Sequence, residues 1–242
     1  MGIAANLLQR VIAEARTFRR SLLKAAYLRP KVRDDVINQF HRLYYESEAF
    51  GETWNNTTFL GVRITKCPLD MWIYQEIIFE LRPDLVIETG TCYGGSALYI
   101  ASLFDLVNHG KIVTIDIEEK ESRPEHERIT YITGSSTADD TLQKLNQELN
   151  GCSSIMVILD SDHKKDHVLK ELAIYSKLVT VGNYLIVEDT NVNGHPVLPD
   201  HGPGPMEAVD EFLETNKRFK ADTAKEKLLM TYNPKGYLRR VK

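Results

Sequence analysis

Acidic residues follow directly after two apolar stretches in the second half of the chain. Asp160 comes after residues 156–159, and Glu188 and Asp189 come after residues 185–187. Such apolar stretches are typical of buried strands, and neighbouring parallel strands end at the same edge of a sheet. Three carboxylates gathered there would offer the hard oxygen ligands that Mg²⁺ prefers, with positions left for a substrate oxygen. The alternative is that these carboxylates only cap the turns after the strands.

A histidine stands close to the first of these acids. His163 lies three residues beyond Asp160, on the same predicted loop. A bound metal ion would lower the pKa of a substrate hydroxyl group. His163 could then act as the general base, because the ordinary pKa of histidine lies near working pH. Lys164 and Lys165 are rival candidates for this role, and a surface position without any role is the alternative for His163.

A third apolar stretch, residues 85–87, leads into a glycine-rich turn. Gly90 breaks the predicted strand, Gly94 and Gly95 follow, and a helix is predicted to start near Ser96. This turn would direct backbone N–H groups and the positive end of a helix dipole at a bound anionic group. An ordinary strand–helix corner without a ligand is the alternative.

The spacing of the glycines narrows the class of ligand. A dinucleotide fingerprint has glycines at its first, third and sixth positions, but here Gly90 and Gly95 flank Cys92 at the third position. The missing glycine is the one that lets a pyrophosphate approach the backbone. A nucleotide-like ligand without a pyrophosphate, such as S-adenosylmethionine (SAM), would tolerate this change.

SAM also suits the polar groups around the turn. Glu88 at the strand end could bind its ammonium group, and the turn with Ser96 could bind its carboxylate. Asp116 ends the next predicted strand, where an acid commonly binds ribose hydroxyls. The turn residues assigned to the cofactor are Gly90, Thr91, Tyr93 and Gly94, and Asp160 would also border it.

The elements around these residues predict an α/β fold. Strands are predicted at 85–87, 111–117, 129–133, 154–159 and 184–187, and they alternate with helices at 69–81, 96–103, 137–149, 168–178 and 206–216. This alternation is typical of a Rossmann-like, mostly parallel, doubly wound sheet. Two further strands, predicted at 228–232 and 237–241 and joined by a turn, would form an antiparallel C-terminal edge.

The N-terminal part of the chain, residues 1–49, is predicted to be a helical extension of a domain that spans residues 50–242. A first helix over residues 1–28 has one apolar and one basic face, and a second is predicted over 34–47. A basic amphipathic helix could lie on a membrane surface. Packing on its own domain or on a second subunit is favoured, because Glu14 dilutes the positive charge and no tryptophan anchors the helix.

Composition limits the function classes. The 242 residues include 43% hydrophobic and 26% charged residues, as in soluble globular proteins. A net charge of −4 gives no basic bias, so nucleic acid is not an expected partner. No apolar run approaches the roughly 18 residues of a membrane span, and no signal-peptide pattern is present. Three widely spaced cysteines, Cys67, Cys92 and Cys152, favour neither disulfides nor zinc and fit a reducing cytoplasm.

A long predicted loop, residues 190–205, carries His195 and His201. Loops of this length in compact domains are often lids or binding loops, although simple exposure of both histidines is the alternative. His195, His201 and Trp72, with Trp54 and Tyr93, could line a pocket for a sugar or another ring. For Trp72, a place in the core is equally compatible with the sequence.

Several separate motifs resemble one known family. They lie at residues 69–76, 82–91, 94–96, 159–163, 186–190, 194–205 and 232–238. Together they resemble the family named for a cephalosporin hydroxylase, whose better characterised relatives are SAM-dependent O-methyltransferases, including rhamnosyl O-methyltransferases. The resemblance covers about residues 50 to 242.

The resemblance implies a class I methyltransferase fold and an oligomeric assembly. It assigns Glu88, Gly90, Ser96 and Asp116 to SAM, with Ser135 and Ser136 on the adenine side, and it places Mg²⁺ on Asp160, Glu188 and Asp189. The layout is also similar to that of catechol-type O-methyltransferases. Those enzymes have a lysine as the base three residues after the first acid, where this chain has His163.

These observations predict a SAM-dependent, Mg²⁺-assisted O-methyltransferase that acts on a hydroxyl group of a small molecule, either a sugar or a natural product. The first alternative is an oxidoreductase or hydroxylase that uses a dinucleotide. The missing third glycine and the lack of a two-histidine, one-carboxylate iron site argue against it. The second alternative is a non-catalytic SAM-binding protein, which would bind SAM without any dependence on a metal.

Overall fold

The computed structural model describes residues 2–27, 29–51 and 53–242. The chain divides into two compact units between Leu43 and Tyr44. The first unit is helical: α1 spans Gly2–Tyr27, and α2 begins at Pro30 and continues to Tyr45. The second predicted helix therefore starts earlier than expected, because proline is well tolerated in the first turn of a helix. Among the residues described, no helix has both the length and the apolar character that a membrane span requires.

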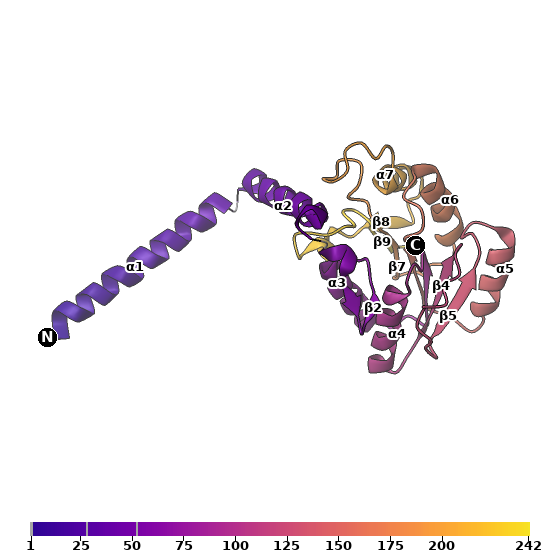
Figure 1. Ribbon diagram of the computed structural model, residues 1–242. Helices are drawn as coiled ribbons and strands as arrows, with labels where there is room; N and C mark the ends of the chain where they lie inside the picture. The colour runs from indigo at the N-terminus through magenta and orange to yellow at the C-terminus, as the bar shows by residue number, and fades with distance from the viewer. Residues whose placement is uncertain (1, 28, 52) are drawn as a thin grey trace. The chain divides into compact units, whose positions relative to one another are not determined.

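The second unit contains a seven-stranded sheet with the order β5-β4-β3-β6-β7-β9-β8 (Figure 1). The first five strands in this order are parallel, and β9 runs antiparallel to both β7 and β8. The strands are β3 (Leu85–Thr89), β4 (Lys111–Asp116), β5 (Ile129–Thr133), β6 (Ile155–Leu159), β7 (Tyr184–Val187), β8 (Phe219–Ala221) and β9 (Tyr237–Arg240). The predicted doubly wound sheet with an antiparallel C-terminal edge is confirmed.

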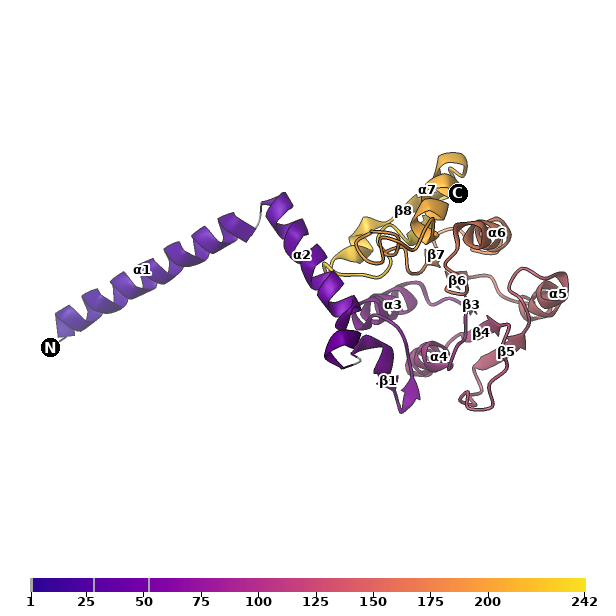
Figure 2. The same cartoon turned by 45° about the horizontal axis from the view of Figure 1, so that its top comes forward.

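Helices cover both faces of this sheet (Figures 1 and 2). One face packs on α3 (Pro68–Leu81) and α4 (Gly95–Val107), and the other packs on α5 (Asp139–Glu148), α6 (Lys165–Tyr175) and α7 (Pro205–Thr215). In β3, Leu85 and Ile87 point into one core and Val86 into the other. Because both faces are buried, the central strands are continuous apolar runs, which is why the sequence shows them clearly.

Short elements complete the unit. A small hairpin of β1 (Thr58–Phe59) and β2 (Val62–Arg63) precedes α3, and three 3₁₀ turns lie at Ser47–Phe50, Trp54–Asn56 and Thr223–Glu226.

The predicted strand at 228–232 is wrong, because this segment binds the start of α3 instead of a strand. The backbone N–H of Tyr232 donates to Asp70 Oδ2 over 2.8 Å, and the hydroxyl of Thr231 donates to Asp70 Oδ1. Tyr237 at the start of β9 also donates to Asp70 Oδ1, over 2.7 Å. The buried carboxylate therefore accepts one backbone N–H and one hydroxyl from this segment, which stays outside the sheet, and β8 forms the edge of the sheet.

Candidate active site

The carboxyl ends of the central strands bring the predicted acids together. In the sheet register, Thr89 of β3 lies beside Leu159 of β6, and Leu159 lies beside Val187 of β7. The next residues continue this pairing: Asp160 N–H donates to the carbonyl of Thr89, and Glu188 N–H donates to the carbonyl of Leu159, each over 3.0 Å. Asp160 and Glu188 therefore stand side by side at the edge where ligands bind in such sheets.

Gly90 allows the turn after β3 to lie close against the end of β6. Its φ is +90°, and an added Cβ would lie 1.8 Å from the carbonyl oxygen of Asp160. Its N–H donates to the carbonyl of Ile115 over 2.8 Å. The turn after β3 therefore passes directly against the end of β6, and only glycine combines the positive φ with the lack of a side chain.

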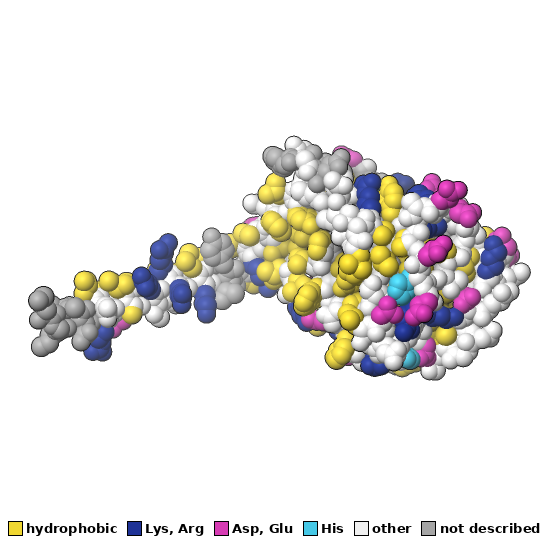
Figure 3. All heavy atoms as spheres, turned by 60° about the horizontal axis from the view of Figure 1, so that its bottom comes forward, with side chains coloured by type: hydrophobic (Ala, Val, Ile, Leu, Met, Phe, Trp, Pro, Cys, Tyr) yellow, Lys and Arg dark blue, Asp and Glu magenta, His cyan; other side chains and the backbone are white. Residues whose placement is uncertain are grey.

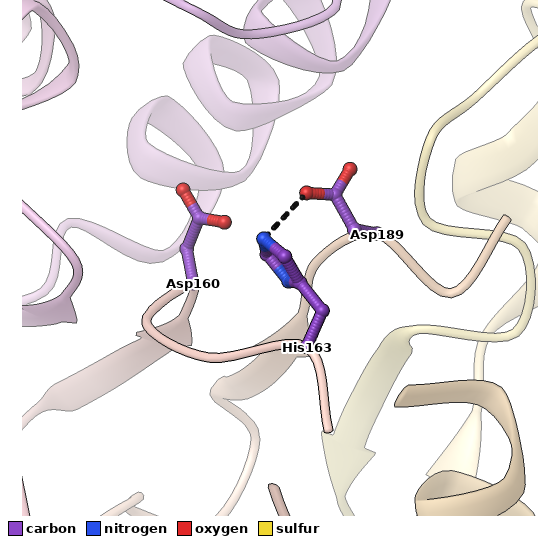
Figure 4. A group of neighbouring side chains, drawn as sticks. All are labelled: Asp160, His163 and Asp189. Atoms are coloured by element: carbon purple, nitrogen blue, oxygen red, sulfur yellow. Dashed lines mark ion pairs between the residues drawn. The ribbon is translucent and has the colours of Figure 1, made fainter. Parts of the chain in front are cut away.

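Three side chains meet where a metal ion could bind (Figure 4). Among the residues described, Asp160, His163 and Asp189 each offer a ligand atom, and these atoms lie within 4.8 Å of one another. His163 Nε2 is 3.3 Å from Asp189 Oδ2. Asp189 has a left-handed backbone with φ of 52°, and its N–H donates to Asn233 Oδ1. The predicted base, His163, thus stands among the predicted metal ligands.

Glu188 is placed differently from the two aspartates. Its Oε1 accepts hydrogen bonds from Lys66 Nζ at 2.6 Å and from the hydroxyl of Tyr74 at 2.8 Å. Burial raises the pKa of Glu188 well above its ordinary value, with further contributions from Asp160 and Asp189, while Lys66 opposes them. Glu188 thus shares Lys66 with Asp160, and it lies outside the set of three side chains whose ligand atoms gather within 4.8 Å of one another.

Lys66 is a component of the site that the sequence did not reveal. Its side chain is only 6% exposed, and its Nζ lies 2.5 Å from Asp160 Oδ2, 2.6 Å from Glu188 Oε1 and 4.0 Å from Glu88 Oε1. Burial lowers the pKa of Lys66, but the three carboxylates outweigh this effect and raise it well above the ordinary value. Lys66 is therefore a cation that neutralises the acids at the strand ends.

Glu88 lies deepest in this group. It is fully buried, and its Oε2 accepts a 2.7 Å hydrogen bond from the hydroxyl of Thr114. Its Oε1 is buried without a hydrogen-bond partner. Burial raises the pKa of Glu88, and Lys66 acts in the opposite direction. A buried carboxylate oxygen without a donor is costly, so a ligand that brings an N–H group to it would be favoured.

Asp116 at the end of β4 fixes the glycine turn. Its Oδ2 accepts the N–H of Cys92 over 2.7 Å and lies 3.1 Å from the guanidinium of Arg123, and its Oδ1 accepts the N–H of Glu118. Cys92 has a φ of 48°, which this hydrogen bond helps to hold. The predicted ribose-binding acid thus also positions the turn that would receive the rest of the cofactor.

A cavity of about 610 Å³ opens at this edge. Its lining includes the predicted cofactor residues Gly90, Asp116, Ser135, Ser136 and Asp160, together with Trp54, His163, Asp189, Leu198 and His201. A neighbouring cavity of about 20 Å³ shares Gly90 and Asp160 and is also lined by Lys66, Thr91, Tyr93 and Ser96. Most of the residues predicted to bind the cofactor, the metal ion or the methyl acceptor therefore line these two neighbouring cavities.

The structure does not bring Trp72 and His195 to the cavity lining. Trp72 is 60% exposed, because it lies on the outer side of α3, whereas Ile73, Tyr74 and Ile77 face the sheet. Glu88, Glu188 and Gly94 are also absent from the lining: both glutamates are buried, and Gly94 caps α4 with a φ of 81°.

His195 belongs to a hydrogen-bond network that fixes the loop before α7. Glu207 Oε1 lies 2.9 Å from His195 Nε2 and accepts from the side chain of Asn193, while Oε2 accepts the N–H of Gly204 over 2.7 Å. Burial raises the pKa of Glu207, but these hydrogen bonds outweigh it and lower the pKa to about 2. The loop is therefore tied to the first turn of α7, and it places His201 and Leu198 at the cavity.

The family model described as Rhamnosyl O-methyltransferase/CmcI matches residues 51–241. The chain belongs to this family. It is therefore an enzyme, a SAM-dependent O-methyltransferase.

Curated relatives support the same assignment. Rhamnosyl O-methyltransferases of Mycobacterium tuberculosis and Mycobacterium bovis are 40% identical over 223 residues, which cover 88% of this chain and 89% of theirs. The rhamnosyl O-methyltransferase of Mycobacterium leprae is 39% identical over 213 residues, covering 85% of this chain and 90% of its own.

Solved structures agree on the fold. A CmcI structure with Mg and SAM has a TM-score of 0.61 at 21% identity and covers 79% of each chain. The O-methyltransferase TomG from Streptomyces achromogenes, in complex with SAM, has a TM-score of 0.53 at 17% identity and covers 85% of this chain and 90% of its own. The fold of residues 44–242 is that of class I methyltransferases.

Proposed function

We propose that the enzyme transfers the methyl group of SAM to a hydroxyl group of a sugar or a glycosylated natural product, with the help of Mg²⁺. The observation that carries this proposal is the grouping of Asp160, His163 and Asp189 beside the cavity that also contacts the glycine turn. The curated relatives are named rhamnosyl O-methyltransferases, which favours a sugar as the methyl acceptor. Their methyltransferase assignment also argues against a dinucleotide-dependent oxidoreductase.

The residues around the turn fit SAM. Its ammonium group would satisfy the buried Oε1 of Glu88, which lacks a donor. We assign its carboxylate to Ser96 and the turn, with Thr91, Tyr93 and Gly94, and its ribose to Asp116. Ser135 and Ser136 line the same cavity and are assigned to the adenine. Bound there, SAM would supply a methyl group that its sulfonium already activates.

The donor set also fits Mg²⁺. Asp160 and Asp189 offer carboxylate oxygens, which Mg²⁺ prefers. We keep Glu188 as a third ligand, through Oε2, since the bonds from Lys66 and Tyr74 both go to Oε1. The ion would lower the pKa of the acceptor hydroxyl and orient it.

In this proposal, His163 takes up the proton that the acceptor hydroxyl releases. Asp189 Oδ2, 3.3 Å from Nε2, would stabilise the imidazolium that forms. SAM held beside Glu88, Ser96 and Asp116 would supply the methyl group to the acceptor oxygen, and the broken carbon–sulfur bond would leave its electron pair on the sulfur. His201 and Trp54 at the cavity are assigned to the acceptor. We place this reaction in the cytoplasm, which the widely spaced cysteines favour.

Calorimetry tests the proposal directly. We would measure the binding of SAM and of Mg²⁺ to the wild type, to Asp160→Ala, and to Asp166→Ala, an exposed control on α6. We expect SAM to bind all three proteins and Mg²⁺ binding to be lost only in Asp160→Ala. Methyl transfer to rhamnose-bearing acceptors should follow the same pattern. A wild type that binds no SAM would overturn the proposal, and methyl transfer that does not depend on Mg²⁺ would overturn the role assigned to the metal ion.

A further inference from the structure

The cavity lining includes His167 and Ser161, which have no part in the proposed reaction. His167 and Glu171 lie four residues apart on α6, so they share one face of that helix. His167 Nε2 is 3.0 Å from the hydroxyl oxygen of Ser161 and 3.3 Å from that of Ser136, which also lines the cavity. Glu171 itself is fully buried. A buried carboxylate is therefore linked to the cavity through a histidine and two hydroxyl groups.

The burial of Glu171 sets this group apart from other contacts between histidines and carboxylates. Figure 3 shows histidine side chains beside acidic ones on the exposed surface of the molecule. His126, for comparison, meets Asp105, whose side chain is 46% exposed. The side chain of Glu171 is 1% exposed, and its Oε2 has no hydrogen-bond partner. Because a buried carboxylate is costly, it needs the donors around it and fixes the directions in which they point.

The hydrogen bonds in this group have one consistent direction. The carboxylate of Glu171 can only accept, so the single hydrogen of the Ser161 hydroxyl goes to its Oε1, over 2.8 Å. The contact between Ser161 and His167 then requires a hydrogen on Nε2 of the histidine. The same N–H group faces the hydroxyl oxygen of Ser136. Ser136 therefore accepts from His167, and its own hydrogen remains for a ligand in the cavity.

The backbone around Ser136 is fixed beside the position assigned to the ribose. The N–H of Gly134 donates to the carbonyl of Asp116 over 2.8 Å, and the hydroxyl of Tyr175 donates to the carbonyl of Ser136 over 2.7 Å. In the proposed function, on which this inference rests, Asp116 binds the ribose and Ser136 borders the adenine. The adenine then meets a hydroxyl group whose position and hydrogen are both determined by the protein.

A hydroxyl group with a fixed hydrogen can distinguish one purine from another. N3 and N7 are acceptors in adenine and in its 6-oxo counterpart, hypoxanthine, so a freely rotating hydroxyl would serve them equally well. The two rings differ at position 1, where adenine has an acceptor and hypoxanthine carries a hydrogen. We infer that Glu171 and His167 direct the hydroxyl of Ser136 to donate to N1 of the adenine, and that this contact selects a 6-aminopurine cofactor over a 6-oxopurine one. A hypoxanthine ring would set two donors against each other.

Calorimetry with nucleoside derivatives tests this inference without any methyl transfer. We would compare the binding of S-adenosylhomocysteine and of S-inosylhomocysteine, its 6-oxo analogue, to the wild type. S-adenosylhomocysteine should bind about 10- to 100-fold more tightly, because the analogue leaves a donor unsatisfied. The 7-deaza analogue, S-tubercidinylhomocysteine, should bind as tightly as S-adenosylhomocysteine, because it lacks only N7.

Variants of His167 test whether this residue positions the hydroxyl of Ser136. His167→Phe removes the N–H group, so the hydroxyl can rotate and accept from hypoxanthine, and the preference for S-adenosylhomocysteine should fall about fivefold or more. His167→Gln keeps an N–H group and should retain most of the preference. His109→Phe, at a residue outside the cavity lining, is the matched control and should keep the wild-type preference.

The outcomes separate this inference from the proposed function. Equal binding of S-adenosylhomocysteine and S-inosylhomocysteine to the wild type would overturn the inference and leave the proposed function in place. An unchanged preference in His167→Phe, or weak binding of the 7-deaza analogue, would do the same. A wild type that binds none of the three compounds would overturn both.

Discussion

The two sides of the candidate active site differ in how their charges are paired. On the interior side, Lys66, Glu88 and Glu188 are buried and lie within one group of contacts. On the cavity side, His163 and Asp189 are partly exposed, and their contact is a single pair at 3.3 Å. Asp160 joins the two sides, because it bonds Lys66 and also belongs to the candidate metal group. The charges on the interior side are thus held by their contacts with one another. On the cavity side, Asp160, His163 and Asp189 offer ligand atoms that could bind a metal ion.

The largest expected effect belongs to the cavity side. His163→Gln should lower the rate of methyl transfer by about 10²- to 10⁴-fold, because general bases typically contribute this much. Stability and SAM affinity should change little. His109→Gln, beyond the end of α4, serves as the control and should keep the wild-type rate.

Calorimetry of Mg²⁺ binding separates two roles for this histidine. If His163 is the base, Mg²⁺ affinity should stay unchanged in His163→Gln while the rate falls. If His163→Gln loses Mg²⁺ affinity together with the rate, the imidazole is a metal ligand. If the rate of methyl transfer is unchanged, His163 is not the base.

On the interior side, Lys66→Met should reduce the free energy of unfolding by about 3–5 kcal/mol, because it leaves buried carboxylates without their cation. Urea unfolding measures this change. Lys170→Met, at an exposed position of α6, should alter it by no more than about 0.5 kcal/mol. Equal stability of both variants would contradict the view that Lys66 neutralises the interior side.

The contact between the two strand ends can be tested at Gly90. Gly90→Ala combines a strained backbone with a Cβ that would lie 1.8 Å from the carbonyl oxygen of Asp160. Gly182→Ala has a similar positive φ of 94° but meets no atom within 4 Å, so it isolates the strain alone. We expect Gly90→Ala to be the less stable by about 1–3 kcal/mol and to bind SAM more weakly. Equal losses of stability in Gly90→Ala and Gly182→Ala would show that the close approach to Asp160 is unimportant.

The smallest effect concerns the loop that carries His201. The pKa of Glu207 is lowered to about 2 in the folded chain, whereas an unfolded glutamate titrates near 4.3. A lowered folded-state pKa gives stability that is fully present above the unfolded value and is lost as the pH falls toward about 2. Glu207→Gln should therefore be less stable than the wild type by about 1 kcal/mol at pH 6, and this difference should vanish near pH 2. Glu214→Gln, exposed on α7, is the control for urea unfolding at both pH values.

Short sequence patterns predicted much of this arrangement. The central strands are buried on both faces, so runs such as residues 185–187 were recognisable, and the acids directly after them had to share one edge. Lys66 was not predictable, because its partners Asp160 and Glu188 lie 94 and 122 residues away and no motif surrounds it. The outer position of Trp72 also depended on which side of α3 meets the sheet, and α3 is apolar on several sides.

The carboxylate of Asp70 also constrains the order in which the fold can be completed. Its hydrogen-bond donors, Thr231, Tyr232 and Tyr237, lie 161 to 167 residues later in the chain. During synthesis on a ribosome, α3 emerges long before these donors do. Closure of the core around Asp70 must wait for them, because burying the charge without them is costly. β9 in the same segment pairs with both β7 and β8, so the antiparallel edge of the sheet and the surroundings of Asp70 become native in one late, long-range step.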